Sequence, residues 1–458
     1  MVTASLTGEV VQFIERTTLA DIPAPVVQRA KTLVTDFLGV AVAGSVEPQA
    51  RIVHRFLDEH GGGGTATVIG CSERTTVPWS ALANGVAGHA LDFDDVSQTM
   101  YGHPTVAVLP AALAAAELVG CGGSTLLESY IIGVEVAVKL ASSMKPAHYQ
   151  KGWHSTSTLG SLGATAAAAK LLRLRGPELH SALALGASQA CGLQQNFGTM
   201  TKTFHAGRAA QNGIVAALLA QKGFTGDQAI LEAPLGFFQV FSGPGNFRAE
   251  EAVHRLGKPF EIEDPGLILK KHPCCAFSHP SVDAALEIAA RPNFDLSKVD
   301  RVEAYIHHLA NQVLIHMRPK TGLEAKFSLE GCLALALVDK GLSIRSFIDR
   351  SIARAEIQAI IGRVQRRVIP REKCQPTDFG PATVRVCLAD GHTLEGTVEK
   401  AKGTPERPMR LEETEAKYHD CCSGVLSEGV VERSMALLER LERLDRLDEL
   451  MACYRMAS

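Results

Sequence analysis

The sequence predicts a mostly helical protein with an inserted α+β domain. Its 458 residues exceed the roughly 250–300 that one hydrophobic core usually serves, so two domains are expected. Apolar residues recur at three- and four-residue steps through most of the first half, which is typical of helices with one buried face. From about Pro265 to Pro408 short alternating segments replace this pattern, and residues 430–451 return to helical spacing. We therefore expect a large helical domain made of residues 1–265 and 409–458, and a smaller, lid-like α+β domain of residues 266–408.

Long alanine- and leucine-rich segments make up the predicted helical domain. Apolar side chains over positions 26–41 mark one buried helix face, and Gly44 and Pro48 are expected to end that helix. A short strand is expected in TATVIG, residues 65–70. Small residues let helices cross closely, so a compact bundle is expected. Further helices are predicted over residues 106–119, 126–140, 159–172, 182–190 and 209–219.

Alternating segments indicate the sheet of the smaller domain. Residues 302–308 (VEAYIHH) and 383–388 (TVRVCL) alternate like half-buried strands. The pair Asp390-Gly391 stands between the second segment and HTLEGTVE, which is the turn chemistry of a β-hairpin. Helices are predicted between these strands, over residues 282–290 and 329–338.

Composition excludes several classes of partner. The formal net charge is −3, from 46 basic and 49 acidic side chains, and no long run of like charge occurs. Nucleic acid and membranes are therefore not expected as partners. The most apolar stretches are too short to span a bilayer, and the first residues lack the pattern of a secretory signal. Eleven cysteines without a disulfide-framework spacing fit a reducing compartment, so a cytoplasmic protein is expected.

Cofactor and metal motifs are absent from the sequence. It contains no HExxH, no GxxxxGK[ST], no GxSxG and no GxGxxG. Adjacent cysteines in KKHPCCAFSH suit one tetrahedral zinc site poorly, and the usual C-x₂₋₄-C spacing is missing. Neither a metal nor a cofactor is therefore expected. The residues that raise the zinc question are His272, Cys274, Cys275 and His279.

The first group of candidate catalytic residues is acidic and is followed by a histidine. Asp92, Asp94 and Asp95 stand within four positions, which is costly unless they are solvated, paired or functional. Asp92 and Asp95 are three apart and could share one helix face. His103 precedes a helix that begins near Pro104, where the helix dipole would lower its pKa and keep it neutral. The alternative is an acidic helix cap with a surface histidine.

Two further groups add a histidine and cations. His154 lies in GWHSTST, whose hydroxyls and glycines offer a helix N-terminus to an anion. The alternative there is ordinary capping with a buried histidine. Lys202, His205 and Arg208 precede an alanine-rich helix and could clamp a carboxylate, with Lys as a point charge and Arg as a fork. The alternative is a solvated basic loop.

Taken together, these stretches resemble the MmgE/PrpD family. They run in the family's order from about residue 80 to residue 340, and five ordered motifs are more specific than any one alone. The matching stretches are NGVAGHALDFDD followed by GHPTVAVLPAALAAAE, then GWHSTSTLGSLGATAAAAK, KTFHAGRAAQNGIVAALLAQKGFTG, KKHPCCAFSHPSVDAAL and TGLEAKFSLEGCLALAL.

The resemblance implies a helical domain with an inserted α+β domain, a homodimer, and an active site in the cleft between the domains. The family includes 2-methylcitrate dehydratase, cis-aconitate decarboxylase and iminodisuccinate epimerase, and the sequence does not select among their substrates. By motif match, the family's site residues fall on Asp92, His103, His154, Lys202 and Lys270.

Two positions depart from the family's decarboxylases. Cys275 stands near a position that is His there. Residues 311–320 (NQVLIHMRPK) have no Tyr, which those decarboxylases have, although His316 could replace it. Both departures weigh against decarboxylation of cis-aconitate. The adjacent cysteines and TGLEAKFS resemble the bacterial epimerase-like branches more.

The expected mechanism follows from the charge that must develop. In the family's reactions negative charge forms on a carbon next to a carboxylate, and fixed positive charge must stabilise it. Lys202 is expected to hold substrate carboxylates, and His103 and His154 to act as general acid and base on opposite sides of the reacting carbon. Asp92 would orient one of these histidines. The further substrate-binding candidates are Lys270, Arg208, Cys275 and His279.

Three functions remain open at this point. The first is a lyase, either a hydro-lyase or a carboxy-lyase, that abstracts a proton next to a carboxylate in a small di- or tricarboxylic acid. The second is an epimerase or isomerase of a dicarboxylate such as iminodisuccinate. The third is a non-catalytic polycarboxylate-binding protein, against which the His, Lys and Asp set argues. Elimination of water creates an alkene that absorbs ultraviolet light, whereas epimerisation leaves the mass unchanged.

Overall fold

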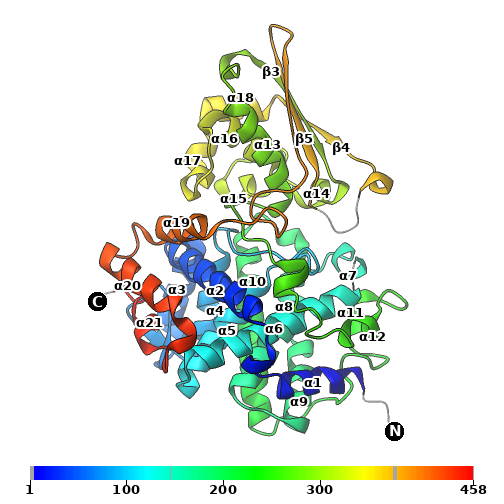
Figure 1. Ribbon diagram of the computed structural model, residues 1–458, viewed down its shortest axis with the longest axis vertical. Coiled ribbons are helices and arrows are strands. Elements are labelled where there is room, and N and C mark those ends of the chain that lie inside the picture. The colour runs from blue at the N-terminus through cyan, green and yellow to red at the C-terminus, as the bar shows by residue number, and fades with distance from the viewer. Residues whose placement is uncertain (1–4, 145, 375–378, 457–458) are drawn as a thin grey trace.

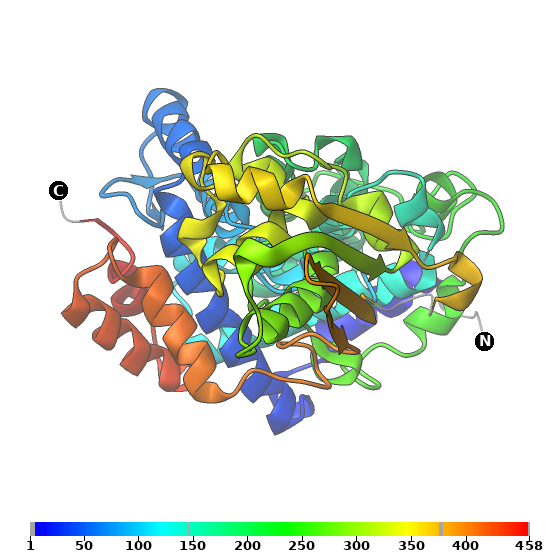
Figure 2. The same cartoon turned by 90° about the horizontal axis from the view of Figure 1, so that it is seen from above.

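Helices form the base of the molecule, and a small sheet with its own helices stands on that base (Figure 1). The computed structural model describes residues 5–144, 146–374 and 379–456. Seen from above, the α+β part lies over the middle of the base, and the C-terminal helices lie at one side (Figure 2). The protein is thus mostly α with a small inserted α+β part, as the sequence predicts. Of the described helices, none is both long and apolar enough to pass through a lipid bilayer.

The base contains the predicted long helices. The helix predicted over positions 26–41 is α2, and it runs through Gly44 to Ser45, so the prediction that Gly44 ends it is wrong. Glycine is required inside this helix because a Cβ at Gly44 would lie 1.9 Å from the carbonyl oxygen of Ala87. The helices are α1 (Leu6–Arg16), α2 (Ala24–Ser45), α3 (Pro48–His60), α4 (Val77–His89), α5 (Pro104–Val119), α6 (Gly123–Met144), α7 (Ala147–Gln150), α8 (Ser155–Leu171), α9 (Gly176–Ser188), α10 (Met200–Gln221), α11 (Phe237–Ser242), α12 (Ala249–Val253), α19 (Leu411–Cys422), α20 (Glu428–Glu439) and α21 (Asp448–Ala452).

Helix α10 packs against α4 and α8 at a separation that only small residues allow. A Cβ on Gly85 of α4 would lie 2.6 Å from the Cα of Gly207 of α10. This close crossing brings the first turns of α10 to the end of α4. Lys202, His205 and Arg208 lie inside those turns and not in a loop before the helix, because α10 begins nine residues earlier than the predicted segment 209–219.

Two predicted segments differ in detail from the structure. TATVIG forms only the two-residue strand β1 (Ala66–Thr67), which pairs with β2 (Arg74–Thr75). The segment 430–451 is two helices, because a 3-10 turn over Leu441–Arg443 separates α20 from α21. Apolar side chains of both helices and of the turn reach the core, so their spacing alone does not mark the break.

The α+β part contains a four-stranded sheet of order β4-β3-β5-β6. Strands β3 (Val299–Ile306) and β5 (Ala382–Leu388) are the predicted strands. The hairpin from β5 to β6 (Thr393–Val398) turns at Asp390-Gly391, as predicted. Strand β4 (Val364–Val368) pairs parallel to β3 at the edge of the sheet. The sequence did not predict it because the three central residues of VQRRV are polar and only the first and last are apolar.

Helices cover one face of this sheet (Figure 1). Helix α13 contacts β5 and β6, and α16 packs beside it and reaches β4. These two helices are the ones predicted over residues 282–290 and 329–338. Side chains of β5 and β6 alternate between buried and more exposed, so the second face is open. The helices are α13 (His279–Ala289), α14 (His308–Val313), α15 (Gly322–Ala325), α16 (Leu329–Asp339), α17 (Asp349–Ile352) and α18 (Ala355–Ile361).

Two large groups of buried apolar side chains divide the molecule. The first runs from Val10 to Leu269 and resumes at Met409, so the C-terminal helices pack onto the base. The second lies mainly between residues 268 and 398. We call the two parts the helical lobe and the α+β lobe. On these two cores we propose the division into a helical domain of residues 1–265 and 409–458 and an α+β domain of residues 266–408.

Candidate active site

An acidic loop after α4 forms the centre of the candidate site. Helix α4 ends at His89 and the chain then turns, so Asp92 and Asp95 do not share a helix face as predicted. Asp92 has a φ of 51°, in the left-handed region that residues other than glycine rarely adopt. Such strain costs about 1–3 kcal/mol and is concentrated at functional sites. Burial and the neighbouring Asp94 raise the pKa of Asp95 well above its usual value.

Two lysines from distant segments meet on the carboxylate of Asp92. Lys202 Nζ of α10 lies 2.5 Å from Oδ1, and Lys270 Nζ lies 2.9 Å from Oδ2 and 2.7 Å from the backbone carbonyl oxygen. All three side chains are buried. Burial alone would raise the pKa of Asp92, but the two ammonium groups hold it well below its usual range. Asp92 therefore stays ionised and fixes both cations in place.

Asp94 holds two histidine rings in defined tautomers. His89 Nδ1 lies 2.9 Å from Asp94 Oδ1, and His89 Nε2 accepts from the ammonium of Lys202 at 2.7 Å. Nδ1 of His103 lies 3.0 Å from Asp94 Oδ2, while its Nε2 lies 3.8 Å from Asp92 Oδ1. Burial lowers the pKa of His103, and it lowers that of His89 to about 4. Both rings are neutral at pH 7. The adjacent carboxylate of Asp94 favours the proton on each Nδ1, although only His89 makes a hydrogen bond with it, and Nε2 of His103 is then able to accept a proton.

His154 is paired with a second histidine. Its Nδ1 lies 3.1 Å from Nδ1 of His205, on α10. Burial lowers the pKa of both rings, that of His205 to about 4. In such a neutral pair one Nδ1 donates and the other accepts. When His205 donates, the proton of His154 sits on Nε2, and His154 can act as an acid.

Two helix N-termini carry His103 and His154. His103 is the N-cap residue of α5, as its predicted place before Pro104 requires, and His154 is the N-cap residue of α8. The backbone N–H of His103 donates to Thr156 Oγ1 at 3.0 Å and ties the two helix starts together. Gly102 permits this contact because a Cβ there would lie 2.9 Å from the Thr156 nitrogen. The partial positive charge of both helix starts favours a bound anion.

A buried cavity of about 40 Å³ lies between the two lobes. It has room for only a few water molecules. The structure brings together there six of the predicted site residues: Asp92, His103, His154, Lys202, Lys270 and Cys275. A larger depression of about 600 Å³ beside Lys139 contains none of these six. The other residues that line the small cavity are Val96, Tyr101, Gly102, Tyr149, Phe197, Ala276, Phe277, Val313, Phe327 and Phe379.

Two predicted substrate-binding residues do not line this cavity. Arg208 is half-buried and its guanidinium donates to Gln211 Oε1 at 2.5 Å. It follows Lys202 by six positions, which is about 240° around a helix, so the two cannot share a face. His279 bonds with the carbonyl oxygen of Cys274 at 3.2 Å, and its neighbour His272 pairs with Asp283 at 2.7 Å.

Two histidines of the site have roles that the sequence did not indicate. His205 follows Lys202 by three positions, so both lie on one face of α10. The sequence grouped the two residues in a loop before the helix, and the pairing of His205 with His154 was not predicted. His89 stands in the HALDFDD stretch, three positions before Asp92, but its bonds to Asp94 and Lys202 depend on the turn after α4.

Two further buried lysines hold the acidic loop by its backbone. Lys326 Nζ donates to the carbonyl oxygens of Leu91 and Pro273, at 2.7 and 2.8 Å. Lys417 Nζ donates to the carbonyl oxygen of Phe93 at 2.9 Å. Burial lowers the pKa of Lys326 to about 8. Because Lys326 comes from the α+β lobe and the loop from the helical lobe, this contact fixes the two lobes against each other.

Cation positions near the acidic loop are taken by ammonium groups. Four buried side chains offer ligand atoms within 4.8 Å of one another: His89, Asp92, Asp94 and His103. However, Lys202 Nζ contacts both His89 Nε2 and Asp92 Oδ1, the atoms that a metal ion would need. A metal ion would have to displace this lysine.

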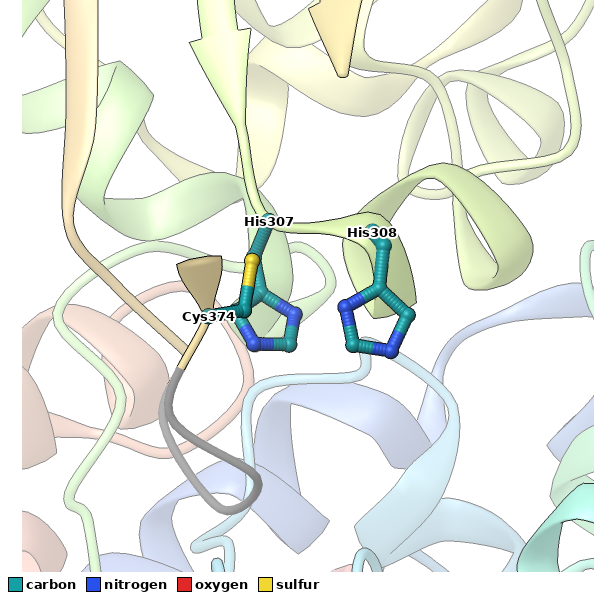
Figure 3. Close-up of side chains that lie close together, drawn as sticks. All are labelled: His307, His308 and Cys374. Atoms are coloured by element: carbon teal, nitrogen blue, oxygen red, sulfur yellow. The ribbon is translucent and has the colours of Figure 1, made fainter. Parts of the chain in front are cut away.

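A second cluster of possible ligands lies at the end of β3, where His307, His308 and Cys374 approach one another (Figure 3). Its partners do not favour a metal ion. The backbone N–H of Leu309 donates to His307 Nδ1 at 3.1 Å, so the proton of this ring sits on Nε2. Burial lowers the pKa of His308, and the positive charge of Arg371 contributes to the same shift. The sequence prediction that assigns no metal remains a prediction.

The fold and the site define the class of protein to which the chain belongs. The model of the MmgE/PrpD N-terminal domain matches residues 8–250, and that of the MmgE/PrpD C-terminal domain matches residues 272–443. The chain is therefore a member of the MmgE/PrpD family.

The sequences of curated relatives align with almost the whole chain. Cis-aconitate decarboxylase of Homo sapiens is 28% identical, with 91% of this chain and 87% of the relative covered. Cis-aconitate decarboxylase of Aspergillus terreus is 27% identical, with 98% and 96% covered. Cis-aconitate decarboxylase-like protein oryM of Aspergillus oryzae is 27% identical, with 94% and 93% covered. These names support a lyase-like function, and at this identity they do not give the substrate.

Proposed function

We propose that the protein is a lyase that abstracts a proton next to a carboxylate in a small polycarboxylic acid. The observation that carries this proposal is that His103 and His154 line one buried cavity together with the ammonium groups of Lys202 and Lys270. General acid–base groups and fixed cations are the two components that such a reaction requires. The lyase names of the relatives support the same reaction class.

His103 serves as the base and His154 as the acid in this proposal. The contact of His103 Nδ1 with Asp94 leaves Nε2 as an unprotonated acceptor at the cavity. His154 donates a proton from Nε2 in its protonated form, so that the donation leaves the neutral ring paired with His205. The base removes the proton from the carbon, and the acid protonates the leaving hydroxyl or, in a decarboxylation, the carbon that CO₂ has left. Groups of this kind contribute roughly 10²–10⁴-fold each.

Lys202 and Lys270 stabilise the charge that develops. Loss of a proton or of CO₂ places negative charge on a carbon and, by delocalisation, on the adjacent carboxylate. The two ammonium groups are held by Asp92 before substrate binds, so they need no reorganisation during the reaction. Exclusion of water from the closed cavity strengthens their effect.

An epimerase remains the second candidate, and one observation favours it. His103 and His154 sit on separate helix starts at one cavity, and both are neutral near pH 7. Two such groups on opposite faces of a carbon invert its configuration when the neutral ring removes a proton and the other ring, in its protonated form, returns one. A third candidate, a polycarboxylate-binding protein without turnover, would use the same cations.

The test is turnover in D₂O followed by proton NMR. The purified protein is incubated with hydroxylated and unsaturated di- and tricarboxylates, cis-aconitate among them. A lyase yields an alkene or releases CO₂, an epimerase incorporates deuterium without loss of mass, and a binding protein does neither. His103→Gln should lower turnover by roughly 10²–10⁴-fold. The matched control is His392→Gln, on the hairpin between β5 and β6, where the side chain is 81% exposed. Near-normal turnover by His103→Gln would end the proposal.

The homodimer that the family resemblance implies is part of this proposal. Sedimentation of the purified chain tests it: a species of twice the 48.9 kDa chain mass is expected, and a monomer at micromolar concentration would contradict it.

A further inference from the structure

The two sides of the cavity differ in chemistry. The acidic, basic and imidazole side chains that line it are Asp92, His103, His154, Lys202 and Lys270, and all but Lys270 come from the helical lobe. Among the described lining residues there is no arginine. Both lysines contact the same carboxylate, so these three side chains carry one net positive charge between them. Behind them the negative charge of Asp94 and the positive charge of Lys326 offset each other, which leaves the sum unchanged. The charge available to a substrate is therefore smaller than the number of cations suggests.

The opposite wall is apolar. Phe277, Val313, Phe327 and Phe379 of the α+β lobe face the cavity, and each is at most 6% exposed. The ring centroids of Phe277 and Phe379 lie 4.4 Å apart in an edge-to-face arrangement, so the two rings form a continuous surface. Cys275 lies beside them, and burial raises its pKa to about 12, so its thiol is uncharged.

Charge balance decides how many carboxylates this cavity accepts. Burial of uncompensated charge is costly, and each carboxylate that enters needs a cation or a proton. One net positive charge, with one proton taken up by a histidine, balances two carboxylates. A third carboxylate would stay uncompensated and would press against phenylalanine rings.

We propose that the substrate is a dicarboxylate that carries a short apolar substituent where a tricarboxylate has its third carboxylate. The substituent packs against Phe277, Phe379 and Val313, and the two carboxylates bind between Lys202 and Lys270. This inference rests on the proposed function for the site that it uses. Because the cavity holds only about 40 Å³, the side chains that line it have to move apart to admit the substrate.

A matched pair of ligands tests the proposal on the unmodified protein. Propane-1,2,3-tricarboxylate and 2-isobutylsuccinate have the same heavy-atom skeleton, but an isopropyl group replaces one carboxylate in the second. Calorimetric titration at pH 7.5 should give a dissociation constant at least tenfold lower for 2-isobutylsuccinate. Equal or tighter binding of the tricarboxylate would overturn the proposal, and so would failure of both ligands to bind.

A variant pair examines the cause of the preference. Cys275→His adds a titratable group to the apolar wall near Lys270, and Cys275→Ser changes the same side chain without adding one. At pH 6 the ratio of the two dissociation constants should move at least fivefold towards the tricarboxylate in Cys275→His and should stay within twofold in Cys275→Ser. An equal shift in both variants would contradict the charge argument.

Deuterium exchange separates this inference from the proposed function. Bound 2-isobutylsuccinate should exchange the proton next to a carboxylate with D₂O in the wild type and not in His103→Gln. If it binds in preference to the tricarboxylate but never exchanges, the substrate class stands and the proposed reaction fails. If the tricarboxylate both binds more tightly and exchanges, the reaction stands and the substrate class is wrong.

Discussion

The helical lobe and the α+β lobe contribute unlike halves to one cavity. The helical side supplies Asp92, His103, His154 and Lys202, each fixed by a helix terminus, a helix turn or the acidic loop. The α+β side supplies a wall of phenylalanines and a valine, with Lys270 at the junction. Groups that transfer protons and stabilise charge are thus separated from apolar groups that contact the rest of the substrate.

This difference indicates that the helical side determines the type of reaction and that the apolar wall determines the substrate. Hydrogen bonds between buried groups define the tautomers on the helical side, so one substitution there changes several partners. Of the wall, Phe327 lies over the ammonium of Lys202, at 5.0 Å from the ring centroid, whereas Phe277 and Phe379 pack against each other. Relatives at 27–28% identity can therefore share a reaction type without sharing a substrate.

The largest effect is expected on the helical side, at Lys202. Lys202→Met removes the ammonium that contacts both Asp92 and His89, so turnover should fall by roughly 10²–10³-fold or more. Steady-state kinetics measures this loss, with the substrate that the turnover experiment in D₂O identifies. Circular dichroism checks the fold. Lys202→Arg keeps the charge and should recover part of the rate. Wild-type turnover in Lys202→Met would show that the cations of the helical side do not determine the reaction.

The second largest effect is expected at His205, which acts through His154. His205→Phe removes the partner of His154 Nδ1, and turnover should fall by roughly 10–100-fold because the acid loses its tautomer. His205→Asn places an amide near the same position and should restore part of the loss. The pH profile provides the decisive readout: the acid limb of kcat/KM should shift in His205→Phe. A loss of rate that is equal in both variants, with an unmoved profile, would indicate a structural role only.

A smaller effect is expected on the apolar wall. Phe379→Leu keeps an apolar side chain but reduces the contact with the substrate, so KM should rise severalfold while kcat changes little. The variant for comparison on the helical side is His154→Gln. Its kcat should fall while its KM stays nearly constant. If Phe379→Leu lowers kcat as strongly as KM rises, the wall takes part in the chemistry and the comparison fails.

The smallest effect is a pH dependence of stability that arises on the helical side. The folded-state pKa of His89 and of His205 is lowered by burial to about 4, below the unfolded value near 6.5. Between these two values the unfolded chain binds more protons, so the free energy of unfolding should fall as pH decreases from about 6.5 to about 4. Urea titrations across this range measure it. The slope should be smaller in His205→Phe, and an unchanged slope would show that His205 is not buried neutral.

Much of the fold follows from local patterns, and most of the site does not. Helix periodicity predicted α2, α5, α6, α8 and α16, and the Asp390-Gly391 turn predicted the β5–β6 hairpin, because these signals are local. The ordered motifs placed Asp92, His103, His154, Lys202 and Lys270, which meet in one cavity.

What the sequence did not predict depends on helix phase and tertiary contact. Arg208 was grouped with Lys202 and His205 because the start of α10 was placed too late, and the true phase keeps only His205 on the face of Lys202. The tautomer of His89 is set by Asp94 and Lys202, and the contact with Lys202 spans 113 positions. No sequence spacing encodes such a contact. The phenylalanine wall was missed because single aromatic residues in separate segments carry no motif.

A crystal structure of the protein with 2-isobutylsuccinate bound would show whether the two sides of the cavity divide the substrate as proposed. We expect one carboxylate within hydrogen-bond distance of Lys202 or Lys270, the adjacent carbon between the rings of His103 and His154, and the isobutyl group against Phe277 and Phe379. A ligand outside this cavity, or one whose carboxylate lies on the phenylalanine wall with the alkyl group at the lysines, would contradict it.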